Sequence, residues 1–335
     1  MCQVYGRELL QQTGVRRTES LLDILLMDRT TQRNIIWATA DYSDFGIGYA
    51  PKDEIQPAQI SGKNSGFIQS RVFKAFQEQY SRTREKAEVF TPSWICNEQN
   101  NLIDSAWFGR ENVFNAPESP DKRRWRPSAG KVEFPSEKGR DWKHYVDANR
   151  MEMACGEAPY LVSCYDTVSG DGIPIENRIG LLDRKLRIVN ENAETEEGWL
   201  HWACRAFQSV YGFEYQGDNL FLARENLFAT FVEYYHMMYR RMPDMLWLYK
   251  IATVISWNLW QMDGQKCVVP RSCYMMRIRE ISLFGEEVRE ERCPGCQYGD
   301  IRRHNGAYCN IKDWRGQKIV PFISLLKGGG SRAII

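Results

Sequence analysis

Four residues near the end of the chain have the types and spacing of a metal site. Cys293, Cys296, His304 and Cys309 follow the pattern C-x2-C-x7-H-x4-C. Two cysteines separated by two residues can hold their thiolates at tetrahedral distance around one ion, and an imidazole and a third thiolate complete a common set of four ligands. The spacing therefore predicts a small structural zinc knuckle.

Other interpretations of these cysteines stay open. Cys267 or Cys273 can replace one of the four ligands, and the cysteines can also be reduced thiols that bind no metal. A redox function is disfavoured, because the C-x-x-C pair is not expected to open a helix after a strand. Arg302 and Arg303 stand beside the knuckle and are suited to contacting nucleic acid.

Three further segments, in order along the chain, carry a second pattern. Glu88–Trp94 reads E-V-F-T-P-S-W, Glu152–Leu161 reads E-M-A-C-G-E-A-P-Y-L, and Asn258–Gly264 reads N-L-W-Q-M-D-G. Together they resemble the AdoMet-binding half of the adenine-N6 DNA methyltransferases of restriction–modification systems. That family has an F-T-P segment, a D/E-P-A-C-G-x-G-x-F-L turn and an N-I-x-x-x-D segment in this order. The resemblance covers about residues 80–270, and the A-C-G turn with its flanks is its most specific part.

The resemblance implies an α/β fold, namely a Rossmann-like AdoMet-dependent methyltransferase fold that is incomplete in this chain. A doubly wound sheet binds such a ligand at the carboxyl ends of its strands, and a glycine after the first strand permits a tight turn there. The residues expected to bind AdoMet are Phe90, Thr91, Pro92, Glu152, Cys155, Gly156, Asp218 and Asp263.

Two of these acidic residues have expected roles and simpler alternatives. Asp218 lies directly before a predicted helix and is expected to accept both ribose hydroxyls, but it can also serve only as the helix N-cap. Asp263 is expected to accept the adenine amino group, but Asp263 and Gly264 can also form only a turn.

The chain departs from the family pattern in two ways. Ala158 stands where the family has its second glycine, so a positive φ is costly there, and weaker binding or a differently shaped turn is expected. The 335 residues contain no Pro-Pro dipeptide and therefore no N-P-P-Y tetrapeptide, the segment that binds the target amino group and stacks the flipped base.

The expected function follows from the resemblance and from this departure. The chain is interpreted as the AdoMet-binding part of a site-specific adenine-N6 DNA methyltransferase that is inactive alone. DNA is its expected partner. Either the chain is truncated, or a second polypeptide carries N-P-P-Y and a target-recognition domain. The alternatives are a non-catalytic, zinc-containing DNA-binding or specificity protein on a degenerate methyltransferase scaffold, and a generic α/β protein with chance motifs.

The elements expected to position these residues alternate between strands and helices, as in βαβ units. Helices are predicted at 8–27, 70–88, from about Ser93, and at 197–211, 219–238 and 246–257; strands are predicted at 34–39, 150–154 and 258–261. The predicted regions are a helical and loop region (1–80), the methyltransferase-like domain (81–270, with a surface insertion at 115–143) and a cysteine-rich segment (271–335).

Composition limits the partners. The net charge is +1, so no overall field attracts nucleic acid or anionic lipid, and any such contact needs a local patch. The most basic segment, Lys122–Arg126, lies in the predicted insertion and is either a solvated loop or a phosphate-contacting loop with an aromatic for stacking. Neither a membrane span nor a signal peptide is evident, so a cytoplasmic protein is expected.

Overall fold

Three parallel strands lie at the centre of the computed structural model, which describes residues 20–86, 88–282 and 285–326. The strands are β5 (Arg150–Met153), β6 (Val210–Glu214) and β7 (Leu259–Gln261), side by side in that order. Every residue of β6 is buried, as expected for the middle strand of a sheet that is covered on both faces.

Pairs of helices connect the strands, because parallel neighbours require a crossover. The connection from β5 to β6 contains α7 (Leu181–Asn192) and α8 (Glu196–Gln208), and the connection from β6 to β7 contains α9 (Gly217–Tyr239) and α10 (Met245–Asn258). Most of α9 is buried, which explains why its apolar residues surround the helix instead of forming one stripe.

The remaining described elements are short. Before the sheet and in its first connection lie α2 (Leu21–Leu26), β1 (Met27–Asp28), β2 (Arg33–Asn34), η1 (Ser43–Phe45), α3 (Pro57–Ile60), η2 (Gly62–Asn64), η3 (Arg71–Phe73), α4 (Phe76–Lys86), α5 (Ser93–Phe108), β3 (Asn115–Pro117), β4 (Trp125–Pro127), α6 (Trp142–Asp147) and η4 (Ile175–Asn177). After the sheet lie β8 (Met276–Ser282), β9 (Gly285–Glu291), α11 (Pro294–Tyr298), β10 (Asn310–Asp313), β11 (Lys318–Pro321) and η5 (Phe322–Leu326).

The predicted elements agree with the structure where the pattern is long or the boundary is marked. Helices α9 and α10, strands β5 and β7, and the start of α5 at Ser93 are confirmed. The predicted helix at 197–211 ends at Gln208, because the apolar residues that follow continue as β6. The predicted strand at 34–39 is reduced to β2 and a single bridge between Ile36 and Glu54.

Other boundaries differ more. Of the helix predicted at 8–27, residues 8–19 lie outside the described residues, and α2 covers only Leu21–Leu26. Helix α4 starts at Phe76, not near residue 70. The predicted insertion at 115–143 contains the β3–β4 hairpin and the start of α6. No helix among the described residues is long and apolar enough to cross a membrane.

One hydrophobic cluster joins the three predicted regions. It runs from Leu21 in α2 through the sheet to Phe322 in η5, so the described parts of the chain share a core. Arg224 of α9 fastens the region before the sheet to it. Its buried guanidinium donates to the carbonyl oxygens of Leu25 (2.6 Å), Met27 (3.1 Å) and Leu259 (2.6 Å).

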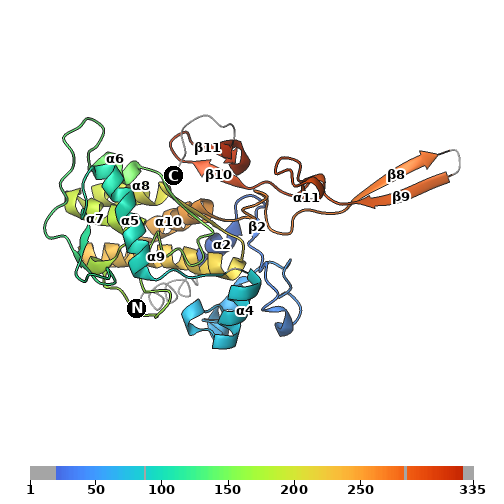
Figure 1. Cartoon of the computed structure of the whole chain (residues 1–335), viewed down its shortest axis with the longest axis horizontal. Coiled ribbons are helices and arrows are strands. Elements are labelled where there is room, and N and C mark those ends of the chain that lie inside the picture. The colour runs from blue at the N-terminus through green and yellow to red at the C-terminus, as the bar shows by residue number, and fades with distance from the viewer. Residues whose placement is uncertain (1–19, 87, 283–284, 327–335) are drawn as a thin grey trace.

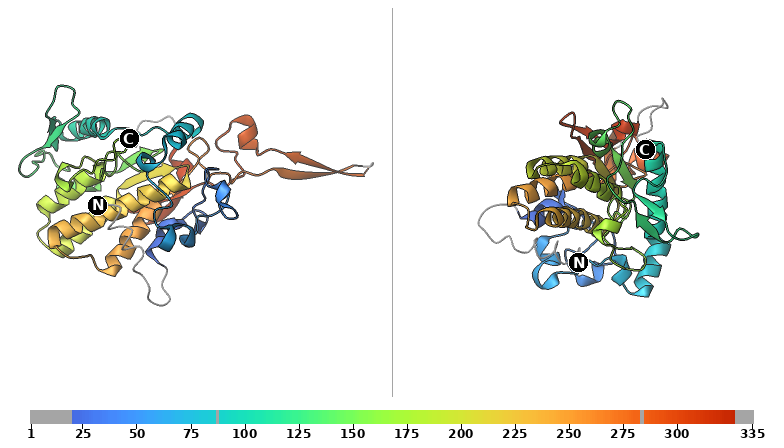
Figure 2. Two further views of the ribbon diagram at one scale, coloured as in Figure 1. Left: turned by 90° about the horizontal axis from the view of Figure 1, so that it is seen from below. Right: turned by 90° about the vertical axis from the view of Figure 1, so that its left-hand side faces the viewer.

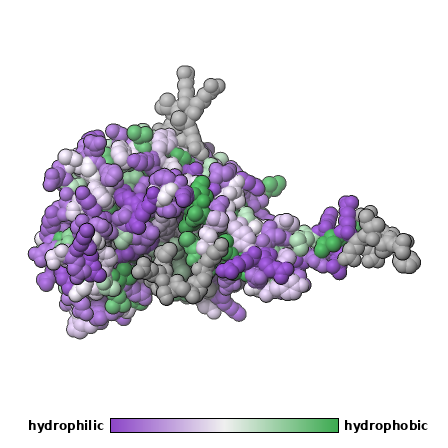
Figure 3. All heavy atoms as spheres, turned by 90° about the horizontal axis from the view of Figure 1, so that it is seen from above, coloured by the Kyte–Doolittle hydropathy of each residue, from purple (hydrophilic) through white to green (hydrophobic). Residues whose placement is uncertain are grey.

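A long arm leaves this body after β7. Strands β8 and β9 pair only with each other, with Met276 opposite Glu291 at the base, and the hairpin projects away from the helices (Figures 1 and 2). The described part of the arm and the face of the body seen in Figure 3 are mostly hydrophilic, with hydrophobic residues in a narrow strip.

A buried ionic cluster fastens α4 to the sheet. Asp218, in the first turn of α9, is fully buried and accepts from the Nζ of Lys74 (3.2 Å), a guanidinium nitrogen of Arg82 (2.9 Å) and the hydroxyl of Tyr42 (3.0 Å). Arg82 also pairs with Glu88 at 2.7 Å. Burial by itself raises the pKa of Asp218, but Lys74 and Arg82 hold it well below its usual range.

This cluster predicts that Asp218→Asn lowers the free energy of unfolding by about 3–5 kcal/mol at pH 7, because the variant removes the fully buried anion that Lys74 and Arg82 share and leaves only their other, partly exposed or already shared partners. Since folding lowers the pKa of Asp218, its contribution is present above the unfolded-state pKa of about 4 and is lost as the pH falls below it. Urea denaturation at several pH values should therefore show a gap between variant and wild type that narrows in acid. The exposed Asp44→Asn is the matched control, and an equal effect of both variants would contradict the prediction.

Candidate functional site

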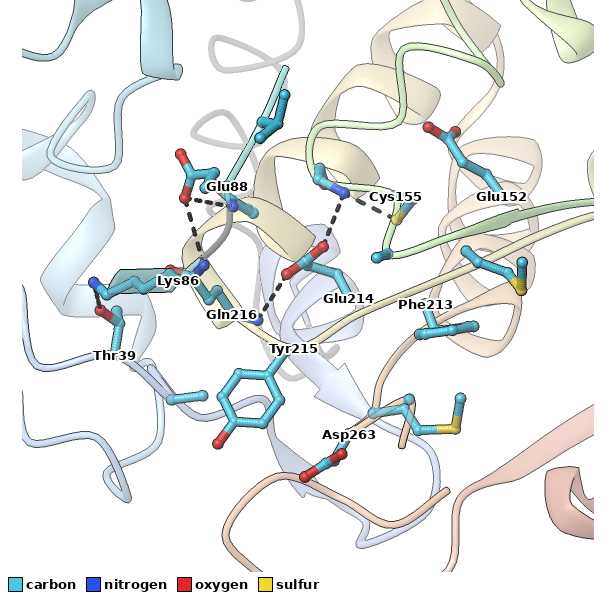
Figure 4. A pocket seen from close by; sticks show the side chains of 18 of the residues that line it. Thr39, Lys86, Glu88, Glu152, Cys155, Phe213, Glu214, Tyr215, Gln216 and Asp263 are labelled. Carbon is cyan, nitrogen blue, oxygen red and sulfur yellow. Dashed lines mark hydrogen bonds between the residues drawn. The ribbon is translucent and has the colours of Figure 1, made fainter. Parts of the chain in front are cut away.

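A cleft of about 930 Å³ opens at the carboxyl ends of β5, β6 and β7 (Figure 4). This volume lies in the range of sites for small molecules and cofactors. Six of the eight residues predicted to bind a cofactor line the cleft, although they come from three segments that are far apart in the sequence: Phe90, Thr91, Glu152, Cys155, Gly156 and Asp263.

The turn after β5 forms the floor of the cleft. Ala154, Gly156 and Ala158 have φ angles of 49°, 52° and 64°, so three residues of this turn are left-handed. Such a conformation costs a residue with a Cβ about 1–2 kcal/mol. The substitution at the second glycine position therefore does not prevent a positive φ there; the surrounding packing holds the fully buried Ala158 in it.

Glu152 stabilises this turn from inside. Its carboxylate accepts from the backbone N–H groups of Tyr160 (3.4 Å) and Leu161 (3.2 Å), which closes the loop back onto the end of β5. Burial raises the pKa of Glu152 well above its ordinary value, and these N–H groups oppose the shift only in part. Glu152 lines the cleft as predicted, but its hydrogen bonds give it a positioning role in the turn.

Glu214, which the sequence analysis did not select, ends β6 at the middle of the cleft. One carboxylate oxygen accepts from the backbone N–H of Gly156 (2.9 Å) and the other from that of Gln216 (3.1 Å), as Figure 4 shows. Each oxygen keeps a second lone pair for a ligand. Burial raises the pKa of Glu214, and the two N–H groups oppose this shift.

Glu214 was not selected from the sequence because the residues before it favour a helix as well as a strand. The aromatic and apolar spacing before it extended the predicted helix to Tyr211, which left no room for a strand. The signal that could have identified it is the run V-Y-G-F-E, in which β-formers end in a carboxylate just before a helix.

Asp218, predicted to accept the ribose hydroxyls, does not line the cleft. Its Oδ2 accepts from Lys74, Arg82 and Tyr42 in the buried cluster described above, and its Oδ1 accepts from the backbone N–H of Asn219 at 2.9 Å. It is also no side-chain N-cap, because Gln216 holds the cap position of α9 and no side-chain capping bond forms there. Its position in the first turn of α9 still favours a negative charge.

The F-T-P segment lies along one wall. Phe90 is mostly buried, and its ring lies under the Arg71 guanidinium at 5.2 Å. Its ring also approaches the turn, with 3.7 Å between its edge and the point where a Cβ on Gly156 would lie. Thr91 lines the cleft, whereas Pro92 does not; Pro92 forms the N-terminal boundary of α5 instead.

Asp263 lies at the opposite wall and fits both interpretations of its segment. It lines the cleft after β7. It also forms a turn, in which its carboxylate accepts from the backbone N–H of Gln265 (3.1 Å) and pairs with Lys266 (3.0 Å). Tyr215, not selected from the sequence, lies between Glu214 and Asp263 in Figure 4, and its partly exposed ring lines the same cavity.

A second site lies at the base of the arm. The ligand atoms of Cys273, Cys293, Cys296 and His304 all lie within 4.8 Å of one another. Each of the three sulfurs is 3.6 Å from His304 Nδ1. A tetrahedral ion with bonds of about 2.3 Å to sulfur and about 2.05 Å to nitrogen requires a separation of about 3.6 Å. This group could therefore hold a metal such as zinc.

The fourth predicted ligand, Cys309, is corrected to Cys273. Cys309 is fully buried against the sheet, where its thiol donates to the Gln261 carbonyl (3.4 Å) and its backbone N–H to the Cys267 carbonyl (3.0 Å). Cys273 reaches the knuckle because the side-chain amide of Asn305 pairs with the backbone of the next residue, Tyr274.

The knuckle is shaped to stabilise thiolates. A Cβ on Gly295 would lie 2.6 Å from the ring of His304, so only glycine lets the imidazole approach the C-P-G-C turn this closely. The backbone N–H of Asn305 donates to Cys293 Sγ at 3.2 Å. Burial by itself raises the pKa of the Cys293 thiol, but the N–H groups of Asn305 and Cys296 lower it to about 6.

Comparisons with known proteins add no family to this description: neither a family model, nor a curated protein, nor a solved structure matches the chain.

The metal centre predicts that the purified protein contains one zinc ion per chain and that Cys273→Ser releases it, because the variant removes one of four ligands. Elemental analysis after dialysis measures this directly. Cys309→Ser is the matched control and should keep the metal, since its sulfur contacts a backbone carbonyl of the sheet. Retention of zinc by Cys273→Ser together with its loss from Cys309→Ser would restore the ligand set expected from the spacing.

Proposed function

We propose that this chain is the AdoMet-binding part of an adenine-N6 DNA methyltransferase of a restriction–modification or phage-defence system, with a Rossmann-like cofactor domain. The observation that carries the proposal is the convergence of the three segments of the resemblance on one cleft. The walls come from Phe90 and Thr91, the turn at Cys155 and Gly156, and Asp263, at the ends of parallel strands.

The chemistry of the cleft supports this ligand. AdoMet carries a sulfonium cation, an amino-acid tail, a ribose and an adenine. Glu214 lines the cleft, and its carboxylate can accept further hydrogen bonds, which suits the two ribose hydroxyls in the role first expected for Asp218. Tyr215, the next residue, offers a ring on which adenine can stack, and Asp263 offers an acceptor for the adenine amino group.

Methyl transfer to an exocyclic amine also needs the target base held in line with the sulfonium. The sequence has no N-P-P-Y segment for this purpose. Among the described residues, no strand pairs with the outer edge of β5, so this sheet edge is open to a further strand. We therefore propose that a second polypeptide supplies the base-binding side and the target-recognition domain.

The alternative function, a non-catalytic DNA-binding or specificity protein, is favoured by one observation. The metal centre and the arm together form a structural unit that projects from the helical body (Figure 1). Binding of AdoMet distinguishes the two proposals, because the alternative has no use for the cofactor.

For AdoMet itself, isothermal titration calorimetry should show saturable binding that Glu214→Gln weakens by about 1–3 kcal/mol through lost ribose hydrogen bonds. Because burial raises the pKa of Glu214, the ionised acceptor is lost early on acidification, and wild-type affinity should fall as the pH decreases from 8 to 5. The variant should lack most of this pH dependence. Glu197→Gln, an exposed carboxylate of α8 outside the cleft, is the control. Absence of any binding heat at millimolar AdoMet would exclude the proposed function.

For catalysis, we expect that the chain alone transfers no tritiated methyl group from AdoMet to mixed-sequence DNA, and that activity appears on addition of a partner that carries N-P-P-Y. The reason is that the target amine lacks acceptors and a stacking platform in this chain. Robust adenine methylation by the chain alone would show that another segment performs this role.

A further inference from the structure

A second concave surface lies beside the cleft and is used by neither site described above. It is a groove of about 240 Å³ between α5 and the β3–β4 hairpin. Its α5 wall is formed by side chains spaced three or four residues apart from Trp94 to Ser105, so it follows one face of the helix for about 16 Å. Trp125 on β4 forms part of the opposite wall.

Buried amides hold the floor of this groove in place. The side chains of Asn97 and Asn115 exchange two hydrogen bonds, of 3.0 and 2.8 Å, and Asn101 donates to Asn115 at 3.0 Å. The buried Arg184 donates to Asn97 at 2.8 Å from below. These amides are therefore fixed by one another, and the groove is preformed.

Two indole rings give the groove flat apolar surfaces. Trp94 and Trp125 are both half-buried. Trp125 is anchored by a hydrogen bond from its Nε1 to the Asn177 carbonyl (2.8 Å). The Arg123 guanidinium lies over the Trp94 ring at 5.7 Å. A preformed polar groove with indoles on two sides suits planar ligands that also form hydrogen bonds, which describes nucleobases.

Positive charge flanks Trp125 along the hairpin, next to a groove whose own charged lining residues are Glu98, Glu111 and Lys122. Four of the five residues 122–126 are cationic. Lys122 is neutralised by Glu98 at 2.8 Å, and Arg123 is only 3.8 Å from Asp121. Arg124 and Arg126 are exposed, and their guanidinium groups form no ion pair or hydrogen bond with a described residue. Free guanidinium groups beside stacking surfaces fit the phosphates of a polynucleotide.

Residues that lie close to each other in the sequence line the groove and the cleft. Thr91 lines the cleft, and Trp94, three residues later at the start of α5, lines the groove. We infer that the α5–hairpin groove binds a nucleic-acid strand, with bases against Trp94 and Trp125 and phosphates on Arg124 and Arg126. This inference rests on the proposed function, since it assigns to the groove the DNA strand that leads to the cleft.

Fluorescence anisotropy with a fluorescein-labelled, mixed-sequence 20-mer, single-stranded and as duplex, tests this at low salt. Arg124→Ala/Arg126→Ala should weaken binding on the order of tenfold and reduce the slope of log K against log salt by about 1.4–1.8, the value for two phosphate contacts. The matched control is Arg241→Ala/Lys250→Ala, which removes two exposed cations near the turn between α9 and α10 and should change neither quantity by as much.

Variants of Trp94 test the proposed stacking of bases on the indole rings. Trp94→Ala should weaken binding by about 5- to 150-fold, and Trp94→Phe should restore most of it, because a phenyl ring still stacks on a base. Wild-type protein that binds no DNA, or Arg124/Arg126 and Trp94 variants that bind as tightly as wild type, would overturn the inference.

AdoMet titrations of the same variants separate the two proposals. If the variants bind AdoMet normally and bind DNA as tightly as wild type, the groove proposal is wrong and the proposed function is unaffected. If the variants bind DNA more weakly and neither they nor the wild type bind AdoMet, the groove proposal is supported and the proposed function is wrong.

Discussion

The buried ion pair between Asp218 and Arg82 is the interaction on which one side of the cleft depends. A carboxylate with no exposed surface must keep its cations, and these cations belong to the segment before the sheet, on α4 and at Lys74. The pair therefore holds the segment from Tyr42 to Glu88 against the carboxyl ends of the strands. It therefore helps to hold the residues that follow Glu88 along the cleft wall.

The same pair decides which carboxylate faces a ligand. In α9 and at the end of β6, Asp218 and Glu214 are four residues apart, and both are buried. One oxygen of Asp218 is held by two cations and a hydroxyl group, whereas the hydrogen bonds to Glu214 come from backbone N–H groups. The difference matters for chemistry, since a carboxylate held by fixed backbone donors remains an acceptor for hydroxyl groups. The proposed AdoMet site relies on that free capacity.

The metal centre has a similar role later in the chain, where it joins segments that are separated in the sequence. Cys273 precedes the β8–β9 arm and Cys293 follows it, so an ion bound by both would clamp the base of the hairpin. A two-stranded ribbon has no core of its own and needs such an anchor. Cys309, by contrast, packs under the sheet and helps to join the cysteine-rich segment to the body.

The sequence by itself determined the features that depend on local order: the long apolar helices α9 and α10, the start of α5 after Pro92, and the strand and turn around Cys155 and Gly156. It also identified three of the four clustered metal ligands, because the C-x-x-C turn is a local structure. Only the tertiary structure decided that Cys273 completes this group and that Glu214, not Asp218, faces the cleft. Both outcomes depend on contacts between residues far apart in the chain, and spacing along a sequence carries no information about which charged or thiol groups such contacts bring together.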